Sequence, residues 1–137
     1  MHIKKTILLL IIFLFSLSGC GSRHEPFFEQ YVFDFDSNYF DEAVNIVEEL
    51  SDKWSLDRYH MNLNQASLFS KGEKAFDISL YVRGKKHPVA NIANIGVPKA
   101  IAFYASRNRG FDENQLRSFS DDVLNTFQKQ NWAKLRE

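Results

Sequence analysis

The hydrophobic residues of the chain change their spacing several times, and each spacing predicts a different element. Residues 31–35 (Tyr-Val-Phe-Asp-Phe) alternate weakly between apolar and polar types, as a short strand does. From Asn38 the spacing becomes helical, because six apolar residues fall on one face of an α-helix and the acidic residues fall elsewhere. These six are Phe40, Ala43, Val44, Val47, Leu50 and Trp54. Ser37 or Asn38 is placed to cap the first turn of this helix.

The middle of the chain has the alternation of β-strands. The clearest run is residues 76–82, in which every second residue is a large apolar one. Tyr59, Met61 and Leu63 alternate as well, which predicts that His60 lies on the opposite face and is exposed to solvent. Two more strands are expected at residues 89–95 and 100–105. Glycine and proline residues separate these runs, and their spacing implies an antiparallel meander.

A second amphipathic helix is expected after residue 111. Asp112 and Gln115 have the spacing of a capping box, in which each side chain bonds to the other residue's backbone N–H. The buried stripe of the helix is Leu116, Phe119, Val123, Leu124 and Phe127. Trp132 follows the helix and is expected to fold back on the core. We therefore predict an α+β domain, with a four- or five-stranded antiparallel sheet and both helices packed on one face.

The first nineteen residues have a different character. Lys4 and Lys5 precede an apolar run at residues 7–15, and small or polar residues follow at 16–19. This is the pattern of a secretory signal peptide. A helix that spans a bilayer needs about 20 apolar residues, roughly twice the length of this run. We therefore expect a cleaved leader and no spanning segment.

The leader ends in Leu17-Ser18-Gly19-Cys20, which resembles the lipobox of bacterial lipoproteins. The resemblance covers the first twenty residues and says nothing of the family of the remaining chain. It implies cleavage after Gly19, a diacylglycerol on the sulfur of Cys20, and an acyl chain on the new N-terminal amine. No other cofactor is expected. Two or three acyl chains hold a protein on a bilayer, so the mature protein is expected to be anchored in the cell envelope.

The lipobox resemblance also bears on localisation and domain organisation. Gly21 follows the cysteine, where an Asp typically retains such proteins in the inner membrane of Gram-negative bacteria. The resemblance therefore favours the outer membrane, facing the periplasm, if the organism has one. We expect a signal peptide at 1–19, the lipidated cysteine and a short tether at 20–30, and one domain at 31–137.

Charge and cysteine content exclude several classes of function. The chain holds 17 Lys and Arg against 17 Asp and Glu. Removal of Lys4 and Lys5 with the leader leaves 15 basic residues against 17 acidic ones, a net charge of 15 − 17 = −2. Nucleic-acid binding needs a concentrated basic excess, so we do not expect it. A single cysteine excludes an intramolecular disulfide and a multi-thiolate metal site.

The residues of the expected domain form no recognisable catalytic set. No serine lies in a Gly-x-Ser-x-Gly elbow, and His24, His60 and His87 lack the paired spacing of metal ligands. Glycan cleavage needs two carboxylates flanking a cleft. The available pairs, Asp34 with Asp36 and Asp121 with Asp122, are explained by helix capping and solvation. We expect no catalytic residue and no metal site.

One cluster remains as a candidate binding site. In a meander, the turn after the strand at 76–82 and the loop after the strand at 100–105 project from the same end of the sheet. The basic residues of these two segments form what we call the basic edge: Arg83, Lys85, Lys86, His87, Arg107 and Arg109. A local positive field of this kind can attract a lipid head group or an acidic protein surface.

The sequence therefore favours a lipid-anchored, non-enzymatic module that binds another envelope protein, as an accessory, assembly factor, inhibitor or immunity protein. The alternative is a carrier or sensor of a small lipid or glycan, held in a pocket between the sheet and the helices. A hydrolase is a third class, which requires the fold to bring distant carboxylates or His60 into one cleft.

Overall fold

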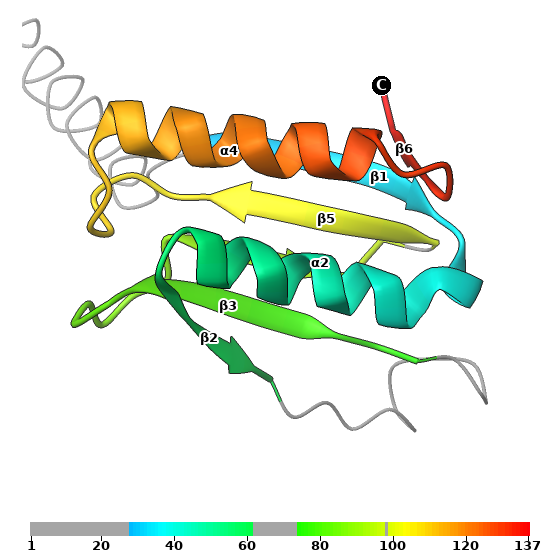
Figure 1. Cartoon of the computed structure of the whole chain (residues 1–137), viewed down its shortest axis with the longest axis horizontal. Coiled ribbons are helices and arrows are strands. Elements are labelled where there is room, and N and C mark those ends of the chain that lie inside the picture. Colours follow the sequence, from blue (N-terminus) through cyan, green and yellow to red (C-terminus); the bar gives the residue numbers. More distant parts are fainter. Residues whose placement is uncertain (1–27, 62–73, 98) are drawn as a thin grey trace, which may run out of the picture.

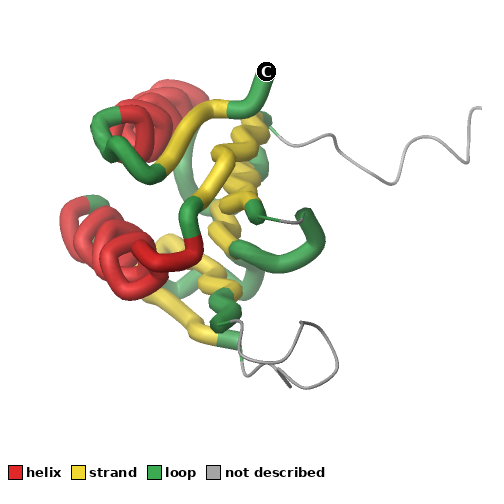
Figure 2. The backbone as a smooth tube through the Cα atoms, turned by 90° about the vertical axis from the view of Figure 1, so that its right-hand side faces the viewer, coloured by secondary structure: helices red, strands yellow, loops and turns green. Residues whose placement is uncertain are grey.

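The computed structural model describes residues 28–61, 74–97 and 99–137. The leader, Cys20 and Leu63 lie outside these residues. The described chain forms two layers, a six-stranded antiparallel sheet and two helices that both lie on one side of it (Figures 1 and 2). The elements in order are β1 (Glu29–Phe35), η1 (Ser37–Tyr39), α2 (Phe40–Lys53), β2 (Leu56–His60), β3 (Asp77–Val82), β4 (Ala90–Ala93), β5 (Ala100–Ala105), α4 (Glu113–Gln128) and β6 (Ala133–Leu135).

The predicted α+β architecture, the antiparallel sheet and the two helices on one face are confirmed, and the strand count differs. Strands β2 to β5 form the expected meander, but the full order is β2-β3-β4-β5-β1-β6. β1 pairs along β5 from Glu29 opposite Ala105 to Asp34 opposite Ala100. β6, which the sequence analysis did not predict, adds to the other side of β1.

Both predicted helices are present, although the first begins differently from expectation. The Asp36 carboxylate accepts a hydrogen bond from the N–H of Asn38 at 3.0 Å and caps η1. α2 follows directly from Tyr39, which makes no side-chain cap. The expected caps, Ser37 and Asn38, are wrong because a 3₁₀ turn precedes the α-helix and contains them. In α4 the capping box of Asp112 and Gln115 is confirmed, with bonds of 2.8 and 3.0 Å.

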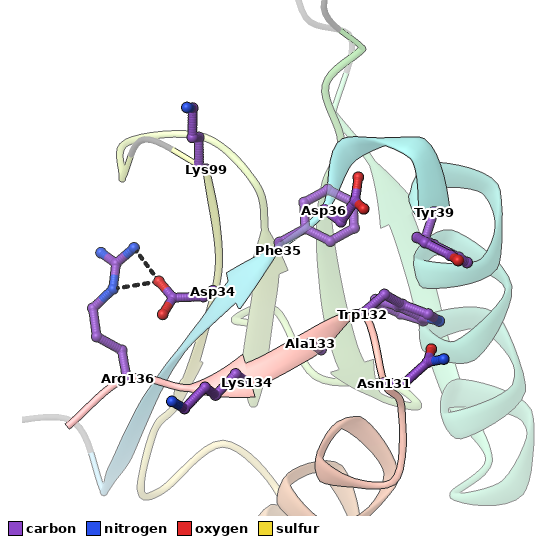
Figure 3. Close-up of a pocket in the computed structure, with 10 residues that line it drawn as sticks. All are labelled: Asp34, Phe35, Asp36, Tyr39, Lys99, Asn131, Trp132, Ala133, Lys134 and Arg136. Atoms are coloured by element: carbon purple, nitrogen blue, oxygen red, sulfur yellow. Dashed lines mark hydrogen bonds and ion pairs between the residues drawn. The ribbon is translucent and has the colours of Figure 1, made fainter.

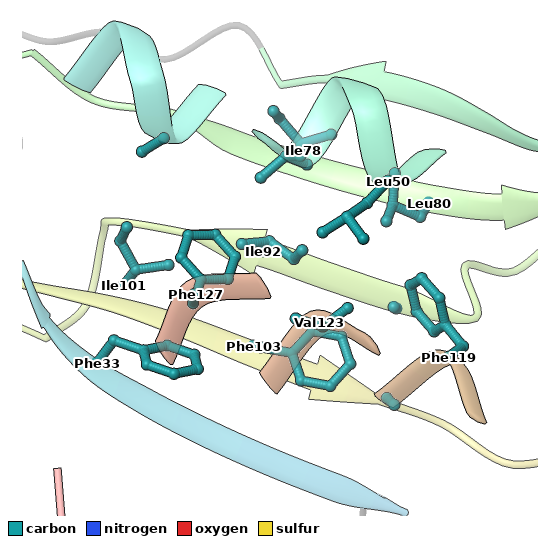
Figure 4. Close-up of a cluster of buried hydrophobic side chains, with 14 of the residues drawn as sticks. Phe33, Leu50, Ile78, Leu80, Ile92, Ile101, Phe103, Phe119, Val123 and Phe127 are labelled. Carbon is teal, nitrogen blue, oxygen red and sulfur yellow. The ribbon is translucent and has the colours of Figure 1, made fainter. Parts of the chain in front are cut away.

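Aromatic rings fill the space between the sheet and the helices (Figure 4). Phe33 and Phe103 of the sheet and Phe119 and Phe127 of α4 are all 0% exposed. The ring of Phe33 lies 5.1 Å from that of Phe127, and the ring of Phe103 lies 6.0 Å from that of Phe119. Burial of one such side chain stabilises the fold by about 1.5 to 3 kcal/mol.

The orientation of β2 is opposite to the predicted one. Tyr59 and Met61 are 59% and 48% exposed, and Leu56 is the buried residue of the strand. Arg58 lies on the helix side, where its guanidinium donates to Asp52 Oδ1 and to Ser51 Oγ of α2. His60 shares that side and is exposed to solvent, as predicted, with its Nε2 3.3 Å from Glu48 Oε1. Polar side chains near the end of α2 therefore pair with Arg58 and His60 of this edge strand. As a result, β2 turns toward the helices the face opposite to the one that the alternation predicted.

Two buried serines provide a matched test of the core. Ser120 is 1% exposed, and its hydroxyl has no hydrogen-bond partner among the described residues. Ser51 is also fully buried, but its hydroxyl donates to the Glu48 carbonyl and accepts from Arg58. We expect Ser120→Ala to raise the free energy of unfolding by about 1 kcal/mol, because an unpaired buried hydroxyl is costly. Ser51→Ala should lower it by about 1 to 2 kcal/mol.

Denaturant unfolding of the two variants and the wild type measures this difference. Equal destabilisation by both substitutions would show that the Ser120 hydroxyl is paired in solution.

Candidate functional site

The two loops that carry the basic edge lie at the same end of the sheet, next to the point where the described chain begins. The N–H of Ser106 donates to the carbonyl of Val89 at 2.9 Å, which joins the loop after β5 to the residue that precedes β4. Gly110 packs against Val82, the last residue of β3. A Cβ on Gly110 would lie 2.7 Å from the Val82 Cβ, so only glycine permits this approach. In Figure 1 this is the end at which the β5 arrow points.

The six residues of the basic edge are not equivalent. The Arg107 Nε lies 3.1 Å from Glu113 Oε1, and the Arg83 Nε lies 3.7 Å from Asp57 Oδ1. Lys85, Lys86 and Arg109 form no ion pair with another described residue. Lys85, Lys86 and His87 are exposed in the tight turn between β3 and β4, where Gly84 has a φ of +82° and the Lys85 N–H closes the turn on the Val82 carbonyl. The uncompensated positive charge of this end is therefore concentrated in one projecting turn.

A groove of about 590 Å³ lies at the opposite end of the sheet, where β1 ends and β6 runs. We call it the distal groove. Charged side chains lie along one part of it, and aromatic rings lie along the other (Figure 3). It is lined by Asp34, Phe35, Asp36, Tyr39, Lys99, Asn131, Trp132, Ala133, Lys134 and Arg136. The sequence analysis did not find this groove, because its residues come from three stretches that lie far apart in the sequence, 34–39, 99 and 131–136.

The aromatic part of the distal groove is closely packed. The Trp132 ring stacks on the Tyr39 ring at 5.7 Å and meets Phe35 and Phe127 edge-on at 5.9 and 6.3 Å. Trp132 thus folds back on the core as predicted. These contacts hold the segment between α4 and β6 against the start of α2.

The charged part of the distal groove carries two unpaired lysines. Arg136 donates from Nη2 and Nε to Asp34 Oδ1 at 2.6 and 2.9 Å, so those two charges are matched. Lys99 and Lys134 are exposed and form no ion pair with another described residue. Lys99 has a φ of +52°, a left-handed conformation that costs a non-glycine residue about 1 kcal/mol.

The carboxylates considered for glycan cleavage have structural roles. Asp34 binds Arg136 and Asp36 caps η1, as described above. The Asp122 Oδ2 atom of α4 accepts a hydrogen bond from the Trp54 indole Nε1 at 2.8 Å and also lies 2.8 Å from Lys53 Nζ. Asp121 lies near Tyr31, where its charge acts on the phenol. Burial, followed by the charges of Glu29 and Asp121, raises the pKa of Tyr31 above its ordinary value.

Among the described residues, no group of three His, Cys, Asp or Glu side chains is arranged to hold a metal ion. No helix in this part of the chain is long and apolar enough to cross a membrane. Comparison of the chain with protein-family models, with curated proteins and with solved structures gives no significant match.

The contact of Asp122 with Lys53 and Trp54 clamps the end of α2 to α4 and makes stability depend on pH. Burial by itself raises the pKa of Asp122, but the hydrogen bonds from Lys53 and Trp54 outweigh it and hold that pKa below the ordinary 3.8. A lowered pKa in the folded state contributes stability that is present above pH 4 and is lost as the pH falls through the folded-state pKa.

We expect Asp122→Ala to lower the free energy of unfolding by about 2 kcal/mol at pH 7, since it leaves the indole N–H and the ammonium without their acceptor. Unfolding measured from pH 7 down to pH 2 should show that the difference between variant and wild type shrinks below pH 4. A difference that stays constant with pH would contradict the assignment.

Proposed function

We propose that the chain is a lipid-anchored protein of the bacterial cell envelope whose domain binds another envelope protein and performs no catalysis. The lipobox resemblance at Leu17–Cys20 supports the anchor. The engaged carboxylates support a binding role, because Asp34, Asp36 and Asp122 already hold the fold together. An accessory, assembly, inhibitor or immunity function is consistent with such a module.

The observation that carries the binding role is the pair of unpaired lysines beside an open sheet edge. β6 is the last strand in the order β2-β3-β4-β5-β1-β6, so no other strand of the described chain pairs with its outer side. An extended segment of a partner can add to such an edge through its backbone. Lys99 and Lys134 then select acidic side chains on that segment. We therefore propose an extended, acidic segment of an envelope protein as the ligand of the distal groove.

For the alternative function, a carrier of a small lipid or glycan, we propose the distal groove as the ligand site. The pocket that we expected between sheet and helices is occupied by the rings of Phe33, Phe103, Phe119 and Phe127. The groove has the volume for a small polar ligand, with aromatic rings and hydrogen-bonding groups side by side.

The anchor is tested at Cys20. We expect metabolic labelling with a fatty acid to mark the wild type and not Cys20→Ser, and the variant to leave the membrane fraction. The mature wild type should begin at Cys20 by mass spectrometry. A mature protein that begins at another residue, or a free thiol at Cys20, would contradict the proposal.

The groove is tested by site-specific photo-cross-linking in intact envelopes. A photoreactive residue at Asn131, which is exposed in the groove, should cross-link to one protein partner, and the same residue at Asn45 on α2 should not. Lys99→Gly should weaken this cross-link at least fivefold without lowering stability, because glycine accepts the left-handed φ and the substitution removes the ammonium group together with its side chain.

Loss of cross-linking together with loss of stability in Lys99→Gly would leave no support for a charge-specific groove. A cross-link to a small polar molecule in place of a protein would favour the carrier alternative.

A further inference from the structure

The end of the sheet that carries the basic edge is also the end from which the chain leads back to Cys20. The N–H of Phe28 donates to the Ala105 carbonyl at 2.7 Å, and β1 begins at the next residue. The Arg107 guanidinium lies over the Phe28 ring, 4.8 Å from its centroid. The start of the domain is therefore fixed against the loop that carries Arg107 and Arg109.

The short tether limits how far this end can lie from a membrane. Cys20 and Phe28 are separated by eight residue steps. A fully extended chain covers at most about 3.6 Å per step, so Phe28 lies within about 29 Å of the lipidated residue. The seven residues of β1 lead away from Phe28 over about 20 Å before the distal groove is reached. The tether thus brings the basic edge closer to the lipid than the groove.

The charge of the basic edge matches an anionic surface. Glu113 and Asp57 compensate Arg107 and Arg83, while Asp112 is held in the capping box of α4. Lys85, Lys86 and Arg109 remain without an ion pair among the described residues. A lysine or arginine near an anionic bilayer changes membrane partitioning about fivefold. Three such cations at the anchored end are sufficient to select one orientation of a domain that the lipid already holds at the surface.

From this juxtaposition we propose that the basic edge binds the phosphate groups of anionic lipids and thereby orients the domain with its distal groove away from the membrane. The proposal rests on the lipid anchor at Cys20 given under the proposed function. An acidic protein face could use the same charges, but the tether favours lipid, since it keeps the edge within reach of the head groups whether or not a protein is present.

The orientation can be measured in proteoliposomes that contain the lipidated protein. Cys20 is the only cysteine, and lipidation converts its sulfur to an unreactive thioether. A single introduced cysteine is then the only thiol that a fluorophore can label. We place it at Asn114→Cys in the first turn of α4, on the anchored end, or at Ser37→Cys in η1, on the other end; both residues are exposed. Lipids that carry a quencher on the head group report the proximity of each fluorophore.

In phosphatidylglycerol vesicles we expect the fluorophore at residue 114 to be quenched at least threefold more than the one at residue 37. This difference should disappear in phosphatidylcholine vesicles and at high salt. Lys85→Glu with Lys86→Glu should abolish it. The matched variant Lys99→Glu with Lys134→Glu, which makes the same change of charge at the distal groove, should retain it.

Equal quenching at residues 114 and 37 would overturn the proposal. A difference in quenching that is the same in phosphatidylglycerol and phosphatidylcholine vesicles would overturn it as well. If Lys85→Glu with Lys86→Glu leaves the quenching unchanged but removes a protein cross-link in envelopes, the edge binds an acidic protein and the lipid assignment is wrong. The failure of the anchor itself is recognised separately, because the wild type would then take up the fluorophore at Cys20.

Discussion

The antiparallel pairing of β1 with β5 is the constraint on which the rest of the structure depends. It places Glu29 opposite Ala105 and Asp34 opposite Ala100, so the first strand lies inside the sheet and not at its edge. As a consequence, the chain enters the domain beside the loop that follows β5. β1 also offers its free side to β6, and this second pairing forms the wall of the distal groove. One strand pairing therefore determines the positions of the basic edge and of the groove.

Two tryptophans join the two helices to each other at opposite ends of the helix layer. Trp54 follows α2, donates to Asp122 of α4 and packs edge-on against Phe119 at 5.5 Å. Trp132 follows α4 and stacks on Tyr39 at the start of α2. Side chains therefore join the two helices at both ends. The buried phenylalanine rings lie between these helices and the sheet. A groove bounded by such contacts keeps its shape, which reduces the entropy lost when a ligand binds.

The sequence predicted those features that depend on neighbouring residues. The helical spacing and the capping box of Asp112 depend on residues three or four positions apart, and both helices were predicted correctly. β6 was not predicted, because three residues carry no periodic signal and their pairing depends on β1, about a hundred positions earlier. The orientation of β2 was predicted wrongly for a related reason. Arg58 and His60 face α2 because Glu48 and Asp52 lie there, and the alternation within one strand cannot contain that information.

The distribution of charge explains why a domain with a slight acidic excess can have two positive surfaces. Five of its acids are paired with a basic residue within the fold: Asp34 with Arg136, Asp52 with Arg58, Asp57 with Arg83, Glu113 with Arg107 and Asp122 with Lys53. Each pair cancels a basic residue locally, and the basic residues without such a pair among the described residues include several in turns and at strand ends. Lys85 and Lys86 remain in a projecting turn at the anchored end, while Lys99 and Lys134 remain at the distal groove. The net charge of the domain therefore describes neither end of the sheet. A ligand within a Debye length of about 10 Å responds to the local excess of charge.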